Sequence, residues 1–520
     1  MALDQTWLED EKSIFAVFAE IGVYDVVALA ETTVYLSTTG YVTSDGSLSF
    51  NPIITGSVGY TESISTDGGV SFSAGDLEIL NTNGDYDDWL DSTKYIWVNR
   101  PITIYVGDPF YSTTNLADLQ SNFITIFSGL ISDIDSKNAN TINLKFRDKL
   151  ERLNCSLTED KLGTYGTWAY QQNNQDSIKP IVFGEVHNIE PLLIDPSTLE
   201  YMINNGNTES LIELRDNGVP IYTVGVLTSG ASVDLSTGKL TLTHPLVGQL
   251  TASVQGVKNS INLSTGALIT GTYSNNIANL IALITTQYGK STTRLTAADL
   301  DLSNLSFFSG SNAQNVGILI SDKENVISVC QQLADSVGAQ LYFNRLGKLQ
   351  LLKLGDPTPD SNVWITTRDM IEGSFSIRAR TDVVAATKIA YCKNWTVQSG
   401  LVTGIPEQHK DMFNTEWFTK TALDATVQSQ YKLLADPTEK QTLLLTYTHA
   451  QAEADRLNNY FKVPRTIYGF TGTSRLLSLK LGQPITLFHH RFNLSGGMVG
   501  QVTSLSPNWL SKTVEVEVII

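Results

Sequence analysis

Residues 320–354, ISDKENVISVCQQLADSVGAQLYFNRLGKLQLLKL, predict a helix followed by a β-hairpin. Ser321 and Glu324 have the spacing of a capping box, which indicates a helix start. Gly338 stands where a C-terminal cap is expected. QLYF and KLQLLKL then form a hairpin across residues 344–347. Apolar side chains recur at helical spacing, which places them on one face: Val326, Cys330, Leu333 and Val337.

Strand patterns dominate the rest of the chain. Up to about residue 175, short runs between turn signals predict strands: SVGYTESIS, DLEIL, ITIYVG, ITIFSGLISDID and TINLKF. Asn217-Gly218 and Thr237-Gly238 then predict two hairpin turns. Two more helices are predicted from their apolar faces: Ile277, Leu280, Ile281 and Ile284 in one, and Ala450, Ala454, Leu457 and Phe461 in the other, which ends at Pro464. At the C-terminus, Val514, Val516 and Val518 alternate with Glu515 and Glu517, as in a half-buried strand.

Residues 75–90, GDLEILNTNGDYDDWL, have the composition of a calcium loop. Placing Gly84 at the sixth position of such a loop puts Ile79 first and Leu90 twelfth, and neither side chain can bind a hard cation. Asn83-Gly84 instead matches the turn between two strands. We therefore predict a tight turn here.

Composition excludes several classes of function. The 520 residues suggest roughly three or four domains, and the net charge of −18 disfavours binding to bare nucleic acid or to an anionic membrane. The cysteines Cys155, Cys330 and Cys392 are far apart, which indicates a reducing compartment. The acidic N-terminus lacks the features of a signal peptide, and Glu20, Gly22 and Asp25 interrupt the apolar run 13–30. We therefore expect a soluble protein.

No catalytic, cofactor-binding or metal-binding residue is predicted. GKST at 289–292 lacks the glycine of a phosphate-binding loop, because Ile284 occupies that position, and Gly289 is better explained as a helix stop. No two histidines have the spacing of a zinc peptidase, and His489 and His490 should point to opposite faces of a strand. Cys330 is expected to be a buried core thiol. The 53 acids make any carboxylate pair non-specific. Trp395, Trp417 and Trp509 are expected in the core rather than on a sugar-binding platform.

Several stretches, taken in order, resemble the central tail hub (baseplate hub) proteins of tailed bacteriophages. They are GDLEILNTNGDYDDWL, KPIVFGEVHNIEP (179–191), VDLSTGKLTLTHPLVGQLTASVQG (233–256), ENVISVCQQLADSVGAQLYFNRLGKLQLLKL (324–354), AYCKNWTVQSG (390–400) and LGQPITLFHHRFNLSGGMVGQV (481–502). The resemblance implies a mainly β, multidomain fold with α+β character in the middle. It implies two tail-tube-like β-barrel domains, at 1–175 and 366–520, separated by an inserted β-rich domain at 176–275 and a helix-plus-hairpin domain at 276–365.

The resemblance also implies a structural role without enzyme activity. Three copies would form a ring at the distal end of the tail tube, adapt six-fold to three-fold symmetry and provide a conduit for DNA ejection. The implied neighbours are a distal tail or tube protein, the C-terminus of the tape measure protein, and tail-tip spike or fibre proteins, with genomic DNA only in transit. The protein would be made in the host cytoplasm and lie in the virion, at the tail tip or baseplate.

Two alternatives of other classes stay open. A tail-tip cell-wall hydrolase would need two carboxylates facing each other across a groove. A carbohydrate-binding adhesin would need exposed aromatic side chains. The net charge is equally compatible with a carboxylate-lined channel that repels DNA and with plain solubility.

Overall fold

The computed structural model describes residues 5–10, 12–56, 58–65, 70–72, 75–163, 174–357, 363–434 and 436–520. The chain forms two compact units, each built from separated segments. Unit 1 comprises Met1–Glu151, Tyr342–Asp382 and Pro464–Ile520, and unit 2 comprises Arg152–Leu341 and Val383–Val463. These bounds differ from the four contiguous domains that the sequence suggests, and that finer division stays a prediction.

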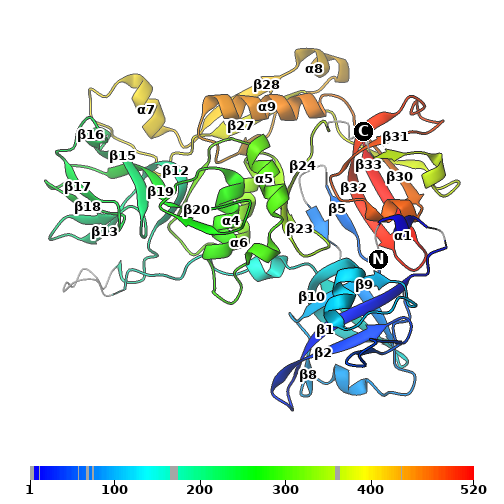
Figure 1. The fold of residues 1–520 in the computed structure, drawn as a ribbon. Helices are drawn as coiled ribbons and strands as arrows, with labels where there is room; N and C mark the ends of the chain where they lie inside the picture. Colours follow the sequence, from blue (N-terminus) through cyan, green and yellow to red (C-terminus); the bar gives the residue numbers. More distant parts are fainter. Residues whose placement is uncertain are drawn as a thin grey trace. The chain divides into compact units, whose positions relative to one another are not determined.

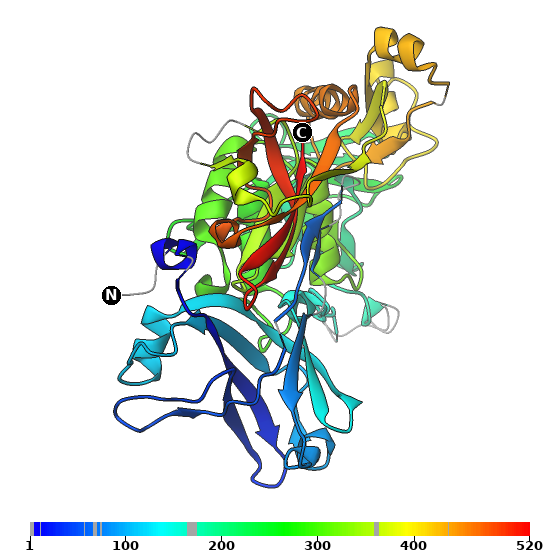
Figure 2. The same cartoon turned by 90° about the vertical axis from the view of Figure 1, so that its right-hand side faces the viewer.

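The first sheet of unit 1 is antiparallel, with the strand order β2-β1-β9-β10-β11-β7 and with β8 paired to β1. Figure 2 shows its strands, blue to cyan, forming a curved sheet. Alternate residues of β1 point inward, where Val17, Ala19, Ile21 and Val23 are fully buried. The strands are β1 (Ala16–Asp25), β2 (Ala30–Ser37), β7 (Gly75–Leu80), β8 (Tyr95–Ile96), β9 (Pro101–Gly107), β10 (Ile124–Asn138) and β11 (Thr141–Arg147).

The second sheet of unit 1 is built mainly from the end of the chain. Its strand order is β25-β31-β32-β33-β30-β26, and β5 (Glu62–Ile64) pairs with β32 and with β6 (Val70–Phe72). One continuous apolar core joins this sheet to the first. The other strands are β25 (Trp364–Ile365), β26 (Ser376–Arg380), β30 (Thr466–Gly472), β31 (Pro484–Leu487), β32 (Met498–Asn508) and β33 (Thr513–Ile519).

Short elements complete unit 1. The helices are α1 (Gln5–Glu9) and α2 (Leu116–Asn122), and β3 (Tyr41–Val42) pairs with β4 (Ser49–Phe50). The 3-10 turns are η1 (Asp87–Leu90), η4 (Thr367–Asp369) and η5 (Ser474–Ser478), and η2 (Leu150–Leu153) lies where the chain leaves this unit.

Unit 2 contains a five-stranded sheet, β16-β15-β19-β12-β22, and a four-stranded sheet, β13-β14-β18-β17. Their facing apolar side chains form one core. The hairpin β20 (Asn259–Ile261) and β21 (Leu268–Thr270) follows β19 (Figure 1). The other strands are β12 (Ile181–Ile189), β13 (Leu192–Asp195), β14 (Glu200–Met202), β15 (Thr208–Asp216), β16 (Val219–Thr223), β17 (Ala231–Asp234), β18 (Lys239–Leu242), β19 (Leu250–Val257) and β22 (Gly317–Ile320).

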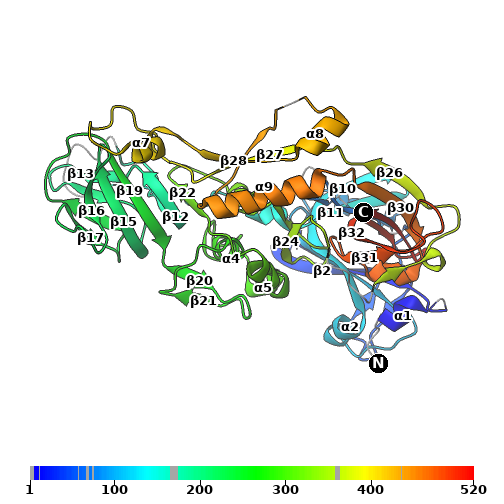
Figure 3. The same cartoon turned by 90° about the horizontal axis from the view of Figure 1, so that it is seen from above.

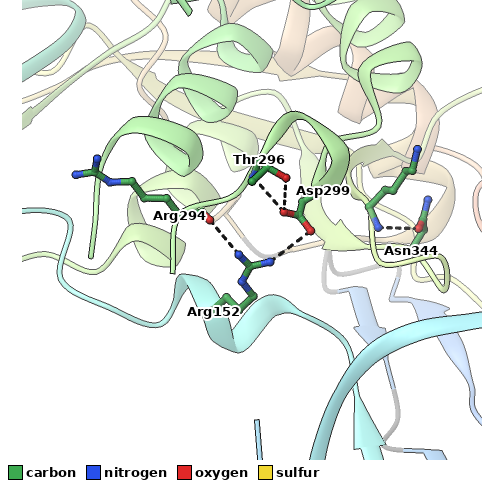
Figure 4. A network of polar contacts seen from close by, with 6 residues as sticks. Arg152, Arg294, Thr296, Asp299 and Asn344 are labelled. Atoms are coloured by element: carbon green, nitrogen blue, oxygen red, sulfur yellow. Dashed lines mark hydrogen bonds and ion pairs between the residues drawn. The ribbon is translucent and has the colours of Figure 1, made fainter. Parts of the chain in front are cut away.

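Helices α4 (Ile277–Gln287), α5 (Leu302–Ser311) and α6 (Val326–Asp335) form one helical group of unit 2. Arg152 fixes the turn η3 (Ala297–Asp299) between α4 and α5 (Figure 4). Its guanidinium donates to Oδ1 of Asp299 at 3.3 Å and to the carbonyl of Arg294 at 2.9 Å. The same carboxylate accepts from the backbone and side chain of Thr296, so one buried acid closes the capping box and holds Arg152. In the hairpin turn after β23 (Ala339–Phe343), also in Figure 4, the Asn344 side chain accepts from the Lys348 amide.

The last part of unit 2 is a three-stranded sheet, β28-β27-β29, with α9 packed along it (Figure 3). The strands are β27 (Ala386–Tyr391), β28 (Phe418–Leu423) and β29 (Glu439–Gln441), and the helices are α7 (Glu407–Asn414), α8 (Ala425–Tyr431) and α9 (Tyr447–Phe461). None of the helices within the described ranges is long and apolar enough to span a membrane.

The structure confirms the main sequence predictions. The fold is mainly β and multidomain, with helices in the middle of the chain. The predicted hairpin is present as β23 (Ala339–Phe343) and β24 (Leu349–Lys353). Helices α4, α6 and α9 lie where their spacing predicts, and Val514, Val516 and Val518 are buried in β33. Both predicted hairpin turns occur, between β15 and β16 and between β17 and β18.

One helix start was predicted wrongly. Helix α6 begins after Asn325, whose side chain accepts from the Ile327 amide, and not at Ser321. Asparagine is as good an N-cap as serine, so the cap lies four residues later than the capping-box pattern suggests.

Candidate functional site

In the 75–90 segment, strand β7 is followed by a turn at Asn83-Gly84, as predicted. Gly84 has φ +72 and its amide donates to the carbonyl of Asn81 at 3.1 Å. The side-chain oxygen of Asn81 accepts from the Tyr86 amide, and its nitrogen donates to Asp87. The turn does not, however, join two neighbouring strands in a hairpin, because β7 pairs with β11. Among the described residues, no group of three His, Cys, Asp or Glu side chains is arranged to hold a metal ion.

The other motifs occupy structural positions. GKST follows α4 as a loop, and Gly289 has φ +77. Cys330 is fully buried in α6, and burial raises the pKa of its thiol. All three cysteines are free thiols.

The prediction for His489 and His490 is wrong. Their rings stack on each other, with centroids 4.4 Å apart, instead of pointing to opposite faces. Strand β31 ends at Leu487, so the alternation of a strand does not extend to them. His489 also stacks on Phe375 at 4.1 Å. Partial burial, followed by the charge of His490, lowers the pKa of His489.

The three tryptophans differ in their surroundings. Trp509 is buried in the core of unit 1, as predicted. Trp395 is only partly buried, and it packs against the core of unit 2 while lining a cleft. The Lys393 ammonium lies 4.0 Å from the centroid of the Trp395 ring and 5.5 Å from that of Trp417. Trp395 is therefore an aromatic residue that a ligand could reach.

The cleft lies within unit 2 and has a volume of about 750 Å³. Its walls come from five stretches that are distant in sequence: 174–180, 190–201, 246–250, 319–322 and 395–396. Apolar side chains on these stretches form part of the surface: Leu192, Leu193, Tyr201, Leu246 and Trp395. Such a size is typical of sites for small molecules or short peptides.

Asn394 holds the loop that carries Trp395. Its buried amide nitrogen lies 2.9–3.2 Å from three backbone carbonyl oxygens, those of Met412, Phe413 and Thr415. Its side-chain oxygen accepts from the Thr396 amide at 3.1 Å. A side chain with this many backbone partners fixes the loop, so the position of Trp395 in the cleft is set by the fold.

The charged groups of the cleft are all acidic. Asp176, Glu190 and Asp322 are exposed on its walls, and no lysine, arginine or histidine is among the described lining residues. Asp176 is paired with Lys161 at 2.8 Å, and Glu190 accepts from the side chain of Gln249 at 3.2 Å. The cleft therefore presents negative potential beside apolar surface.

Unit 1 offers a different kind of surface, at the edges of its sheets. No strand of the described chain pairs with the outer side of β2 over Ala30–Val34, and the first four residues of β2 are exposed. Strand β26 is the corresponding edge of the second sheet, and four of its five residues are exposed. Beside β2, Val27 and Leu29 at the tip of the β1–β2 hairpin are 78% and 74% exposed. Open edges with apolar residues nearby are typical of surfaces that pair with another chain.

Sequence reasoning missed the cleft and its acids. Trp395 was considered as a sugar platform, but Glu190, Asp322 and the Asn394 loop gave no local signal. The cleft is assembled from separated stretches, and only the tertiary structure brings them together.

No protein-family model and no curated protein matches the chain. Among solved structures, it matches the 43 kDa tail protein of prophage MuSo2 from Shewanella oneidensis at 11% identity and TM-score 0.37, covering 96% of this chain and 98% of that chain. It matches a chain of the virion of a native gene transfer agent particle at 13% and 0.42, covering 71% and 90%. It matches the tail protein from Neisseria meningitidis MC58 at 10% and 0.36, covering 96% of both chains. These matches are to tail and virion proteins, at identities and TM-scores too low to carry an argument about this chain.

Proposed function

We propose that the chain is a structural protein of a bacteriophage tail, the hub that closes the distal end of the tail tube as a homotrimer. The observation that carries this proposal is the pair of open edges in unit 1. The two sheets of this unit are built mainly from opposite ends of the chain, and each has an exposed edge strand, β2 or β26.

Strand pairing between copies would give hydrogen-bond partners to the backbone N–H and C=O groups at those edges. Two sheets in each of three subunits would give a ring of six, which matches a six-fold tube while keeping three-fold symmetry. The ordered sequence resemblance to tail hub proteins supports the same role. In this role the chain acts through contacts and not through turnover, in the virion at the tail tip after synthesis in the host cytoplasm.

The proposed neighbours follow from that position. A distal tail or tube protein and the tape measure C-terminus would lie on one side of the ring, and spike or fibre proteins on the other. Genomic DNA would pass through the ring only during ejection.

The native mass of the purified chain tests the ring. One chain has a mass of 57.0 kDa, so a closed trimer should have a mass of about 171 kDa and show three-fold class averages in electron micrographs. A persistent monomer, with no three-fold particle at high concentration, would contradict self-assembly of the ring.

A variant of β2 sharpens this test. The amides of Ser37 and Asn51 show that odd-numbered residues of β2 face away from β1, so the Thr33 amide lies on the open edge. Thr33→Pro removes that donor while leaving the β1 ladder intact. We expect Thr33→Pro to abolish the trimer and the control Thr33→Val to keep it. If Thr33→Pro forms the trimer as well as the wild type does, the β2 edge is not the interface.

A further inference from the structure

We propose that the cleft of unit 2 binds an extended peptide segment that carries basic and apolar side chains, supplied by a partner protein. The proposal rests on three properties of the cleft: its charge, its aromatic wall and a strand edge beside it. It goes beyond the hub function, because it stands on the cleft alone.

Charge is the first argument. The described lining residues include three carboxylates and no base. Lys161 forms an ion pair with Asp176, whereas the partner of Glu190 among the described residues is the neutral side chain of Gln249. Glu190 and Asp322 therefore leave net negative charge facing the cleft. A ligand that brings lysine or arginine side chains complements this charge, whereas an acidic ligand is repelled.

Trp395 gives the second argument. The ring already holds an ammonium group near its face, since Lys393 Nζ lies 4.0 Å from the centroid. One face of the indole is thus already occupied by a cation of this chain, so the ring offers a ligand apolar contact. Leu192, Leu193 and Leu246 lie on the same cleft and offer apolar contact to the side chains between the basic ones. The mixture of acid, aromatic and aliphatic groups matches a peptide of alternating basic and apolar residues.

The strand edge gives the third argument. β13 is the terminal strand of its sheet, and Leu192 and Leu193 on it line the cleft. The carbonyl of Leu193 accepts a long hydrogen bond of 3.3 Å from the side chain of Asn174. A side-chain donor of this kind can be exchanged for a backbone amide, so an extended peptide can add to β13 as a strand. A saccharide has no peptide backbone and cannot extend the sheet as a strand.

Fluorescence anisotropy with a defined probe tests the proposal. The probe is a fluorescein-labelled hexapeptide of alternating leucine and lysine, and the matched probe carries glutamate in place of lysine. We expect the lysine peptide to bind the full-length protein, with an affinity that falls as salt is raised, and the glutamate peptide not to bind. A neutral chitooligosaccharide is titrated in parallel.

Three variants locate the binding. Trp395→Ala should weaken the lysine peptide by about thirtyfold, as expected for a central aromatic contact. Glu190→Gln combined with Asp322→Asn should weaken it by about tenfold, and because both acids are exposed this variant should fold normally. Glu407→Gln removes an exposed acid of α7 outside the cleft and should leave the affinity unchanged.

Several results would overturn the proposal. They are no binding of the lysine peptide, equal binding of both peptides, equal affinity in the Glu190→Gln, Asp322→Asn variant, or binding of the chitooligosaccharide in place of the peptide. The trimer is measured on the same samples. A trimer without peptide binding refutes only the cleft proposal, and peptide binding by a monomer refutes only the ring.

Discussion

Replacing Glu453 with glutamine should destabilise unit 2 by about 2 kcal/mol. The Glu453 side chain is 1% exposed in α9, and its carboxylate accepts from both Nε and Nη2 of Arg456, at 2.8 and 2.6 Å. Glutamine keeps the volume and one acceptor oxygen. The NH₂ group of glutamine takes the place of the other carboxylate oxygen and faces a donor of the Arg456 guanidinium, so one charge-assisted hydrogen bond is lost.

The magnitude follows from the value of that hydrogen bond. A hydrogen bond to a charged group contributes about 1.5–3 kcal/mol, and Arg456, which is 25% exposed, regains some hydration when it is released. A loss of about 2 kcal/mol corresponds to a fall in Tm of about 3–4 °C for a unit of this size. Hydrogen exchange in α9 and β27 should speed up, because these elements pack together.

Lys440 gives the same variant a pH dependence. Burial lowers the pKa of this lysine, and the charges of Glu453 and Asp335 oppose that effect. Without the Glu453 charge, the pKa of Lys440 falls further. A lysine with a depressed pKa contributes stability above its usual pKa and loses it as the pH falls through the folded value. The deficit of the variant should therefore grow from pH 10 toward neutral pH.

The assay is thermal unfolding of the full chain between pH 7 and pH 10. Glu407→Gln is the control, since the Glu407–Lys410 pair has the same i,i+3 spacing in α7 but an acid that is 83% exposed, and it should shift Tm by less than about 1 °C. Adding Lys440→Met to Glu453→Gln should recover part of the loss near neutral pH. If Glu453→Gln behaves like the control, or the added Lys440→Met recovers nothing, the reasoning fails.

Three further predictions concern the core and the turns. Glu62 is buried, and burial raises the pKa of its carboxyl more than the Arg345 charge lowers it. The contribution of Glu62 to the stability of the protein should therefore be highest at low pH and fall as the pH rises above the usual carboxyl range. Glu62→Gln should flatten this fall when stability is measured by urea unfolding, and an unchanged dependence on pH would contradict the prediction. Leu333→Ala should cost about 2–5 kcal/mol because Leu333 is fully buried, whereas Gln332→Ala at an exposed position of α6 should cost little, as denaturant midpoints will show. Gly238 has φ +69, and a Cβ added there would lie 1.9 Å from the Asn204 carbonyl oxygen, whereas Gly400 has a similar φ and no atom within 4 Å of an added Cβ. Gly238→Ala should therefore lower Tm more than Gly400→Ala. Equal losses would show that the backbone conformation alone determines the cost.

Local patterns predicted the elements that local forces determine. Val326, Cys330 and Leu333 repeat at helical spacing because one face of α6 is buried. Gly218 and Gly238 mark hairpins because their positive φ values suit tight turns. Such features depend on a few neighbouring residues, so a single sequence contains them.

The pairing of strands that are distant in the sequence could not be predicted from local patterns of this kind. Strand β5 lies within the first 70 residues, yet it pairs with β32, through Ser63 with Ser504 and Glu62 with Leu505. A strand of three residues has too few side chains to specify its partner by pattern. The N-terminal segment and the C-terminal segment therefore share one unit, which predicted boundaries at 175 and 366 could not convey.

The cleft is a further feature that local sequence patterns could not predict, because its walls come from stretches that are distant in the sequence. Trp395 alone favoured core packing, because most tryptophans in β-domains are buried. Its position depends on Asn394, whose side-chain amide donates to carbonyls of residues 412–415. Its proposed role depends on Glu190 and Asp322, which line the same cleft. Each residue has an ordinary structural explanation by itself. Only their position in the same cleft gives an aromatic residue and two surface acids a common ligand, one of complementary charge.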